Sequence, residues 1–169
     1  MTHASASSPI RTVIVGVGNC ASSLIQGVSY CRALGDQAVG VSFPELAGYT
    51  PGDVELVAGF DVDSRKVGKT LGEAAFAAPN CTEQFHTDLA DQTAPVLRGP
   101  DLDGVAAHML ANPADRSFRL SDAPALSKDE IVAKLKEFNA DVMIIFLPVG
   151  SQPAGEVQLK SAIGAGGAG

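Results

Sequence analysis

Apolar residues form continuous short runs at three places along this chain: TVIVGV at 12–17, VELVAGF at 54–60 and DVMIIFL at 141–147. A strand that is covered on both faces has this pattern, because neither of its faces needs polar residues. We therefore predict central parallel strands at these positions. The shorter run VLRG at 96–99 predicts a fourth strand.

Between the runs, apolar residues recur at the three-and-four spacing of a helix. The first predicted helix starts at Asn19 and ends near Gly35, with apolar positions at Ala21, Leu24, Ile25, Val28 and Cys31. A second is predicted from Ser64 to about Ala77, and a short one over 104–112. Strands that alternate with helices predict an α/β fold with a doubly wound parallel sheet.

Two further helices are predicted near the end of the chain. Ser127 and Glu130 have the spacing of a capping box and precede an apolar helical face that extends to Phe138. After the last strand, Ser151 is a candidate N-cap and Pro153 suits the first turn of a helix.

The chain length of 169 residues fits one domain. We expect a flexible tail at 1–11, a dinucleotide-binding domain at 12–163 and a Gly/Ala tail at 164–169, with 34–52 as an irregular insertion before the second strand.

Composition excludes several classes of partner. The net charge of −7 argues against a nucleic-acid partner, because such binding needs basic residues that neutralise phosphates. No apolar stretch approaches the roughly 20 residues that cross a bilayer, so we expect no membrane contact. The three cysteines lack the C-x-x-C spacing, which predicts no metal site and fits a cytoplasmic protein.

The segment GVGNCA at 16–21 matches the dinucleotide-binding fingerprint G-x-G-x-x-G/A, between a predicted strand and a predicted helix. Gly16 would allow the tight turn, Gly18 the approach of a diphosphate and Ala21 the close packing of the helix. The amides at the helix start, at Asn19 and Cys20, would then face the phosphates. The alternative is a tight strand-to-helix turn that binds nothing.

Asp61, at the end of the second strand, is the candidate partner of the adenosine ribose hydroxyls. It lies further from the glycines than the usual spacing of about 20 residues, and the insertion accounts for the surplus. A carboxylate there favours NAD over its 2′-phosphorylated form, whereas Arg65 and Lys66 favour the opposite. Asp63 is the alternative ribose partner, although we interpret it as the N-cap of the following helix.

Other candidate residues have simpler explanations. Ser22 and Ser23 lack a recognisable His and Asp partner. His86 and His108 are isolated histidines, interpreted as surface residues rather than metal ligands. Cys20 is interpreted as a small packing residue, although a helix start can lower a thiol pKa.

Four segments, IVGVGNCASSLIQGVSYC, VAGFDVDSRKVGKTL, VLRGPDLDG and FLPVGS, occur in an order that resembles the inositol-3-phosphate synthase family, especially its bacterial and archaeal branch. The resemblance runs from about residue 12 to about residue 163. It implies a Rossmann-type domain that binds NAD, in an enzyme that oxidises glucose 6-phosphate, cyclises it by an aldol-type step and reduces the product to inositol 3-phosphate. It also implies that a loop beside the cofactor contains Leu147, Pro148, Val149, Gly150 and Ser151.

The chain also departs from the family pattern. Family members continue into a second domain that supplies the catalytic lysines and much of a homotetramer interface, whereas this chain ends in GAGGAG. The helix after LPVGS also lacks the aromatic residue that is common in the family. We therefore expect an incomplete domain that is inactive by itself, with no catalytic residue to name.

Two alternatives stay open: an NAD-binding fragment of another oxidoreductase, and a non-catalytic dinucleotide-binding module or inert truncated product. The predicted strand at 141–147 would also have a free edge, so we expect self-association.

Overall fold

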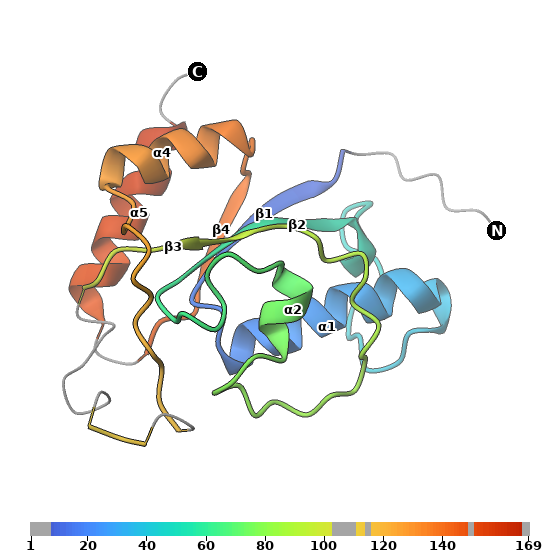
Figure 1. Ribbon diagram of the computed structural model, residues 1–169. Helices are drawn as coiled ribbons and strands as arrows, with labels where there is room; N and C mark the ends of the chain where they lie inside the picture. Colours follow the sequence, from blue (N-terminus) through green and yellow to red (C-terminus); the bar gives the residue numbers. More distant parts are fainter. Residues whose placement is uncertain (1–7, 103–110, 114–115, 149–150, 167–169) are drawn as a thin grey trace.

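The computed structural model describes residues 8–102, 111–113, 116–148 and 151–166. Among these residues, a parallel sheet contains four strands in the order β3-β2-β1-β4 (Figure 1). The strands are β1 (Ile10–Val15), β2 (Val54–Asp61), β3 (Val96–Arg98) and β4 (Val142–Ile145). All four strands were predicted from the sequence, and the predicted α/β class with a parallel sheet is confirmed.

One irregularity interrupts the pairing of β1 with β2. Thr12 pairs with Leu56, but the next residue, Val13, pairs with Ala58, so Val57 is an extra residue in β2. Such a β-bulge shifts the alternation of side chains between the two faces of the sheet. As a result, Leu56 packs into the core on one face, whereas Ala58 and Phe60 pack into the core on the other.

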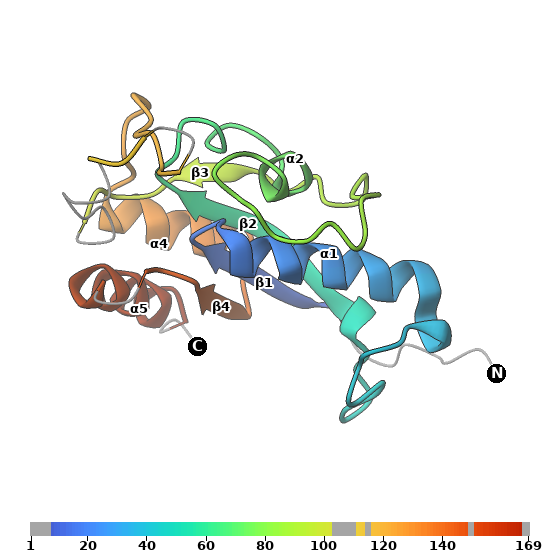
Figure 2. The same cartoon turned by 90° about the horizontal axis from the view of Figure 1, so that it is seen from below.

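Helices cover both faces of the sheet. Helix α1 (Asn19–Leu34) and helix α2 (Leu71–Ala75) pack on one face, and helix α4 (Lys128–Glu137) packs on the opposite face. Helix α5 (Gln152–Gly166) packs against α4, and Figures 1 and 2 show this pair apart from α1 and α2. The doubly wound arrangement is therefore present around these four strands.

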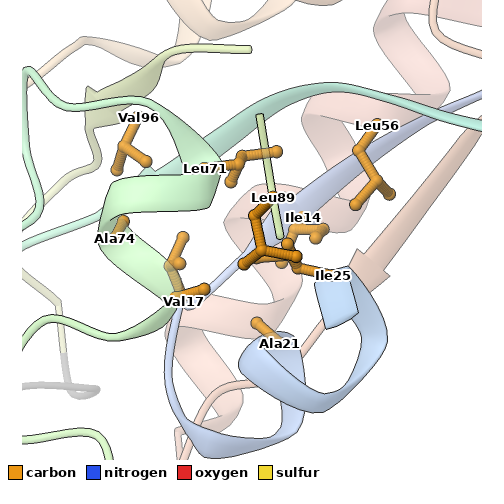
Figure 3. Close-up of a cluster of buried hydrophobic side chains, with 10 residues drawn as sticks. Ile14, Val17, Ala21, Ile25, Leu56, Leu71, Ala74, Leu89 and Val96 are labelled. Carbon is orange, nitrogen blue, oxygen red and sulfur yellow. The ribbon is translucent and has the colours of Figure 1, made fainter. Parts of the chain in front are cut away.

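The larger core cluster lies between the sheet, α1 and α2 (Figure 3). Its buried members are Ile14, Val17, Ala21, Ile25, Leu56, Leu71, Ala74, Ala75, Leu89 and Val96. Gly59 of β2 lies beneath this cluster, where a Cβ atom would come within 2.8 Å of Leu71 Cδ2 and 2.9 Å of Val17 Cγ2. A glycine in β2 thus lets α2 and the turn after β1 pack directly on the strand.

The second predicted helix is wrong over its first half. Residues 64–69 form turns, and the helix begins only at Leu71, where Thr70 and Glu73 form a capping box. The reason is a pairing with distant residues: the Gly68 amide donates to the Val96 carbonyl and the Val96 amide donates to the Lys69 carbonyl. These backbone groups are therefore bonded to β3 and not within a helix.

Strand β4 is shorter and less buried than predicted. It lies at the edge of the sheet, where Val142 and Ile145 are 41% and 37% exposed. The prediction of cover on both faces is wrong for this strand, since Val142 and Ile145 are exposed and Met143 and Ile144 are only half-buried. Among the described residues no strand pairs with the other side of β4, so the predicted free edge is confirmed for this part of the chain.

The boundaries differ from the predictions elsewhere. Strand β1 starts at Ile10, inside the predicted tail, and α5 continues to Gly166. Most of the helix predicted at 104–112 lies outside the described residues. The insertion contains two short 3-10 helices, Gly35–Gln37 and Pro51–Asp53. No helix of the described residues is long and apolar enough to cross a membrane.

Candidate functional site

A cavity of about 330 Å³ opens at the carboxyl ends of the strands. Its walls come from the ends of β1 and β2 and from the segments that follow β3 and β4. From β1 the chain continues to β2 on one side of the sheet, whereas β4 is added on the other side. The cavity lies at this switch point, which is where open α/β sheets bind ligands. Its lining comprises Val15, Gly16, Gly18, Asn19, Phe60, Asp61, Val62, Asp63, Lys66, Pro79, Asn80, Gly99, Pro100, Leu102, Phe118, Phe146, Leu147, Pro148 and Ala154.

Gly16 forms the tight turn at the end of β1. Its φ angle is +87°, in the left-handed region that favours glycine, and its amide donates to the Phe60 carbonyl over 2.8 Å. A Cβ atom at this position would lie 2.6 Å from the Phe146 carbonyl oxygen. The fold itself therefore requires glycine at this position.

Gly18 has a different environment. It precedes α1 with a φ angle of −90°, which most residues can adopt, and it lines the cavity. A Cβ atom here would have no described atom within 4 Å apart from its chain neighbours. Neither the backbone conformation nor the packing of the described residues requires glycine, so its methyl-sized space is open to a ligand.

The start of α1 has no cap from a side chain. Gly18 offers none, and the first turn contains no acidic residue. In contrast, α2 and α4 begin with complete capping boxes, Thr70 with Glu73 and Ser127 with Glu130. The first amides of a helix lack partners within it, and together with the helix dipole they favour an anion. Of these three helices, α1 is the one that lacks a side-chain cap, and its first amides lie beside the cavity.

The carboxylate of Asp61 points toward the glycine turn. Oδ2 accepts the Val17 amide over 2.7 Å, and Oδ1 accepts the amides of Val62 and Asp63 over 2.7 and 2.8 Å. A carboxylate has about four lone-pair positions, so these three bonds leave room for a hydroxyl group. Asp61 can therefore hold the turn and also accept from a ribose at the cavity.

Lys66 and Asn80 hold the other end of the Val17 backbone. Lys66 Nζ donates to the Val17 carbonyl over 2.7 Å and to Asn80 Oδ1 over 2.8 Å, while Asn80 Nδ2 donates to the same carbonyl over 3.2 Å. The Lys66 side chain is 3% exposed. Burial lowers the pKa of Lys66, and the charges of Asp61 and Asp63 only partly offset this effect.

Asp63 is not the N-cap of a helix, as the sequence had suggested. It is 1% exposed and accepts from the Arg65 amide (2.8 Å), the Arg65 guanidinium (2.5 Å) and the Arg119 amide (3.1 Å). Burial alone would raise the pKa of Asp63, but these hydrogen bonds and the Arg65 charge together lower it. Arg65 also donates to the Ser117 carbonyl over 2.6 Å, so its guanidinium is committed to protein partners.

The predicted site residues are only partly brought together. Those that line the cavity are Gly16, Gly18, Asn19, Asp61, Leu147 and Pro148. Ala21 is fully buried in the core, Cys20 is exposed, and the Ser151 carbonyl accepts from the Gly155 amide at the start of α5. Val149 and Gly150 lie outside the described residues.

Asn19 fastens the start of α1 to the segment after α2. Its Oδ1 accepts from the Cys81 amide over 2.8 Å and from the Thr82 hydroxyl over 3.1 Å. Its side chain is therefore bonded to the protein, and its contribution to an anion site is its backbone amide.

Sequence reasoning missed several lining residues, above all Lys66, Asn80 and Phe118. The Lys66 side chain turns inward because of a carbonyl 49 positions away in the chain. Phe118 reaches the cavity because residue 120 bridges to Asp63, and together with Pro100 and Leu102 it adds apolar surface. No local pattern in the sequence marks either contact.

The remaining candidates offer no catalytic arrangement. Ser22 is fully buried and its hydroxyl accepts from the Gln26 amide group, and the His86 ring packs edge-to-face on Tyr30. His108 lies outside the described residues. Within the described residues, no group of three or more His, Cys, Asp or Glu side chains is placed to hold a metal ion.

Comparison with known proteins places these observations in context. No family model matches the chain. The inositol-3-phosphate synthase of Mycobacterium tuberculosis is 42% identical over 163 residues, which are 95% of this chain and 42% of that protein. The synthase of Corynebacterium glutamicum is 40% identical over 161 residues, again with 42% of its length covered. The chain thus spans about two fifths of the length of the curated relatives it matches.

Solved structures agree with the fold. The crystal structure of Ari2 superimposes with a TM-score of 0.73 at 28% identity and covers 93% of this chain and 43% of that one. A myo-inositol-1-phosphate synthase-related protein from Thermotoga maritima gives a TM-score of 0.52 at 19% identity, over 82% of this chain and 34% of that one. At this identity the second likeness concerns the fold alone.

Proposed function

Because the chain belongs to the inositol-3-phosphate synthase family, we propose that it forms the NAD-binding part of an enzyme that converts glucose 6-phosphate to 1D-myo-inositol 3-phosphate. The observation that carries the proposal is the combination at Gly18. An unfilled methyl-sized space and an uncapped helix start face one cavity at the switch point of the sheet.

The lining suits the parts of NAD in turn. The diphosphate would lie against Gly18 and accept from the first amides of α1. The adenosine ribose would donate to the remaining lone-pair position of Asp61, and the adenine would pack on the apolar surface of Phe118 and Pro100. Leu147 and Pro148 would bound the cofactor on the β4 side.

Bound NAD would supply a hydride acceptor and, after reduction, a hydride donor. The chain's own contribution is to bind and orient the cofactor. The titratable side chains of the cavity, Asp61, Asp63 and Lys66, are already engaged in bonds to the turn or to Arg65. We therefore propose that three features lie outside these residues: the groups for proton transfer, the contacts to the sugar phosphate and the tetramer interface. We also propose that the enzyme is a cytoplasmic protein.

Titration of the purified chain with NAD in a calorimeter tests the proposal. We expect saturable binding by the unmodified chain and its loss in Gly18→Asp, which would place a carboxylate at the diphosphate. Gly27→Asp is the matched control, because Gly27 lies within α1, the helix that Gly18 precedes, has open space at its Cβ position and does not line the cavity.

Failure of the unmodified chain to bind NAD, or equal binding by Gly18→Asp, would contradict the proposal. Incubation with glucose 6-phosphate and NAD should yield no inositol phosphate from the chain alone. Product above the level of the Gly18→Asp variant would show that catalytic groups do lie within these residues.

A further inference from the structure

Lys66 is a buried cation at the edge of the proposed diphosphate site. Of the lysines in the described part of the chain it is the buried one, and it lines the same cavity as Gly16 and Gly18. An ammonium group taken out of water needs hydrogen-bond partners. It finds two, the Val17 carbonyl and Asn80 Oδ1, at 2.7 and 2.8 Å.

Asn80 gives this lysine a fixed direction. Its amide nitrogen donates to the carbonyls of Val17 and Ala75 over 3.2 and 3.0 Å, which orients its oxygen toward Lys66 Nζ. The Val17 carbonyl therefore receives two donors, one from Lys66 and one from Asn80.

Val17 is the residue between the two glycines of the turn. Its amide is bound to Asp61 over 2.7 Å and its carbonyl to Lys66 and Asn80, so both polar groups of its backbone are fixed by side chains. The direction of the Gly18 backbone follows from that of Val17. Contacts made behind the turn thus set the orientation of the amides that face the cavity.

Charge balance gives Lys66 a second effect. Asp61, Asp63 and Arg65 lie close enough to influence the pKa of Lys66, and the two negative charges of this cluster balance the two positive charges of Arg65 and Lys66. Without the ammonium group the cluster would carry a net negative charge beside the position of an incoming diphosphate. A neutral apolar side chain could fill the same buried volume without the cost of desolvation, so packing alone does not explain a lysine here.

We propose that Lys66, oriented by Asn80, is a positioning residue for the diphosphate of the cofactor: it fixes the Val17 carbonyl and balances the Asp61 carboxylate. This inference rests on the proposed function. It predicts an effect that depends on the ligand, because adenosine lacks the diphosphate whereas ADP-ribose contains it.

The test compares Lys66→Met with Lys69→Met, an exposed lysine three positions away that does not line the cavity. NMR titration of the 17.3 kDa chain measures both ligands and follows the amide signals of Gly18, Asn19 and Cys20. We expect Lys66→Met to bind ADP-ribose at least about tenfold more weakly and adenosine within about twofold of the unmodified chain, with Lys69→Met unchanged for both.

A second variant separates positioning from general stability. Lys66→Gln retains a donor that can reach the Val17 carbonyl, so it should bind ADP-ribose more tightly than Lys66→Met but more weakly than the unmodified chain. If Lys66→Met does not fold, Lys66→Gln and Asn80→Ala replace it in the test. Each of them should weaken the binding of ADP-ribose more than the binding of adenosine.

The outcomes separate the two proposals. The positioning role is overturned if Lys66→Met binds ADP-ribose as well as the unmodified chain does. It is also overturned if the Lys66 variants bind both ligands more weakly to the same degree. In either case the proposed function stands. If the unmodified chain binds neither ligand, the proposed function fails and the inference falls with it.

Discussion

Replacing each glycine of the turn by alanine should change a different property of the chain. Gly16→Ala would place a methyl group 2.6 Å from the Phe146 carbonyl oxygen at a φ angle of +87°. Gly18→Ala would place it in the cavity at a φ angle of −90°, with no described atom within 4 Å beyond its chain neighbours. The first variant should lose stability and the second should lose cofactor binding.

The magnitudes follow from these environments. A left-handed conformation costs a non-glycine residue about 1–2 kcal/mol, and the contact with the Phe146 backbone adds strain that is relieved only by moving β1 away from β4. We expect Gly16→Ala to lower the free energy of unfolding by roughly 2–4 kcal/mol, within the range of strained positions. For a chain of this size that corresponds to a fall in Tm of roughly 4–16 °C.

Gly18→Ala should change the free energy of unfolding by less than about 1 kcal/mol, because alanine is a poorer N-cap than glycine but reduces the entropy of the unfolded chain. Its methyl group would occupy the position proposed for a phosphate oxygen. We expect at least a tenfold loss of NAD affinity, about 1.4 kcal/mol.

Thermal melts followed by circular dichroism measure the first effect and calorimetric titration measures the second. The reasoning is refuted at Gly18 if its alanine variant binds NAD with unchanged affinity, since the diphosphate would then lie elsewhere. It is refuted at Gly16 if the alanine variant melts at the temperature of the unmodified chain.

Three further predictions concern specificity, pH and assembly. NAD should bind more tightly than its 2′-phosphorylated form in calorimetry, because Asp61 would face the ribose while Arg65 is bound to Asp63 and Lys66 is buried. Equal affinities would remove Asp61 from this role. Asp63→Asn should lower the free energy of unfolding by about 2–4 kcal/mol at pH 7, since it weakens buried, charge-assisted hydrogen bonds. The pKa of Asp63 is lower in the folded chain. Its stabilising contribution is therefore complete above the unfolded pKa, near 4, and is lost as the pH falls through the folded pKa. In urea unfolding below pH 5, the free energy of unfolding should fall more steeply for the unmodified chain than for Asp63→Asn, and parallel pH profiles would contradict the assignment. Ile145→Lys should reduce self-association in sedimentation velocity, because Ile145 is 37% exposed on the edge strand; an unmodified chain that stays monomeric at every concentration would contradict this expectation.

The elements that could be predicted are those with signals in their own residues. Helix α4 was found from its capping box, and α1 from its apolar spacing and the glycines before it. The apolar run of β2 was recognised as a buried strand, but the bulge at Val57 was not, because nothing in the run indicates which residue is extra. The residues of each element indicate whether it is a helix or a strand. The position of the bulge in β2 depends on the pairing of β2 with β1.

What could not be predicted depends on partners far away in the chain. Gly68 and Lys69 leave the predicted helix because they pair with Val96. Lys66 looked like a surface cation that would attract a 2′-phosphate, yet it is buried because the Val17 carbonyl and Asn80 offer it bonds. In the glycine turn, the motif predicted the tight turn at Gly16, whereas the side chains that hold Val17 in place became visible only in three dimensions.

The strand order also has a consequence during synthesis of the chain. In the strand order β3-β2-β1-β4, β1 lies between β2 and β4 and is synthesised before both, and β4 begins only at Val142, which pairs with Thr12, 130 positions earlier. At roughly 5–20 residues per second, that partner arrives about 6–26 s after β1. Until then Val13, Ile14 and Val15 have an unpaired edge even if β2 and β3 have already assembled. Nascent chains on neighbouring ribosomes could pair through this edge, so a chaperone that shields residues 10–15 would act within that interval.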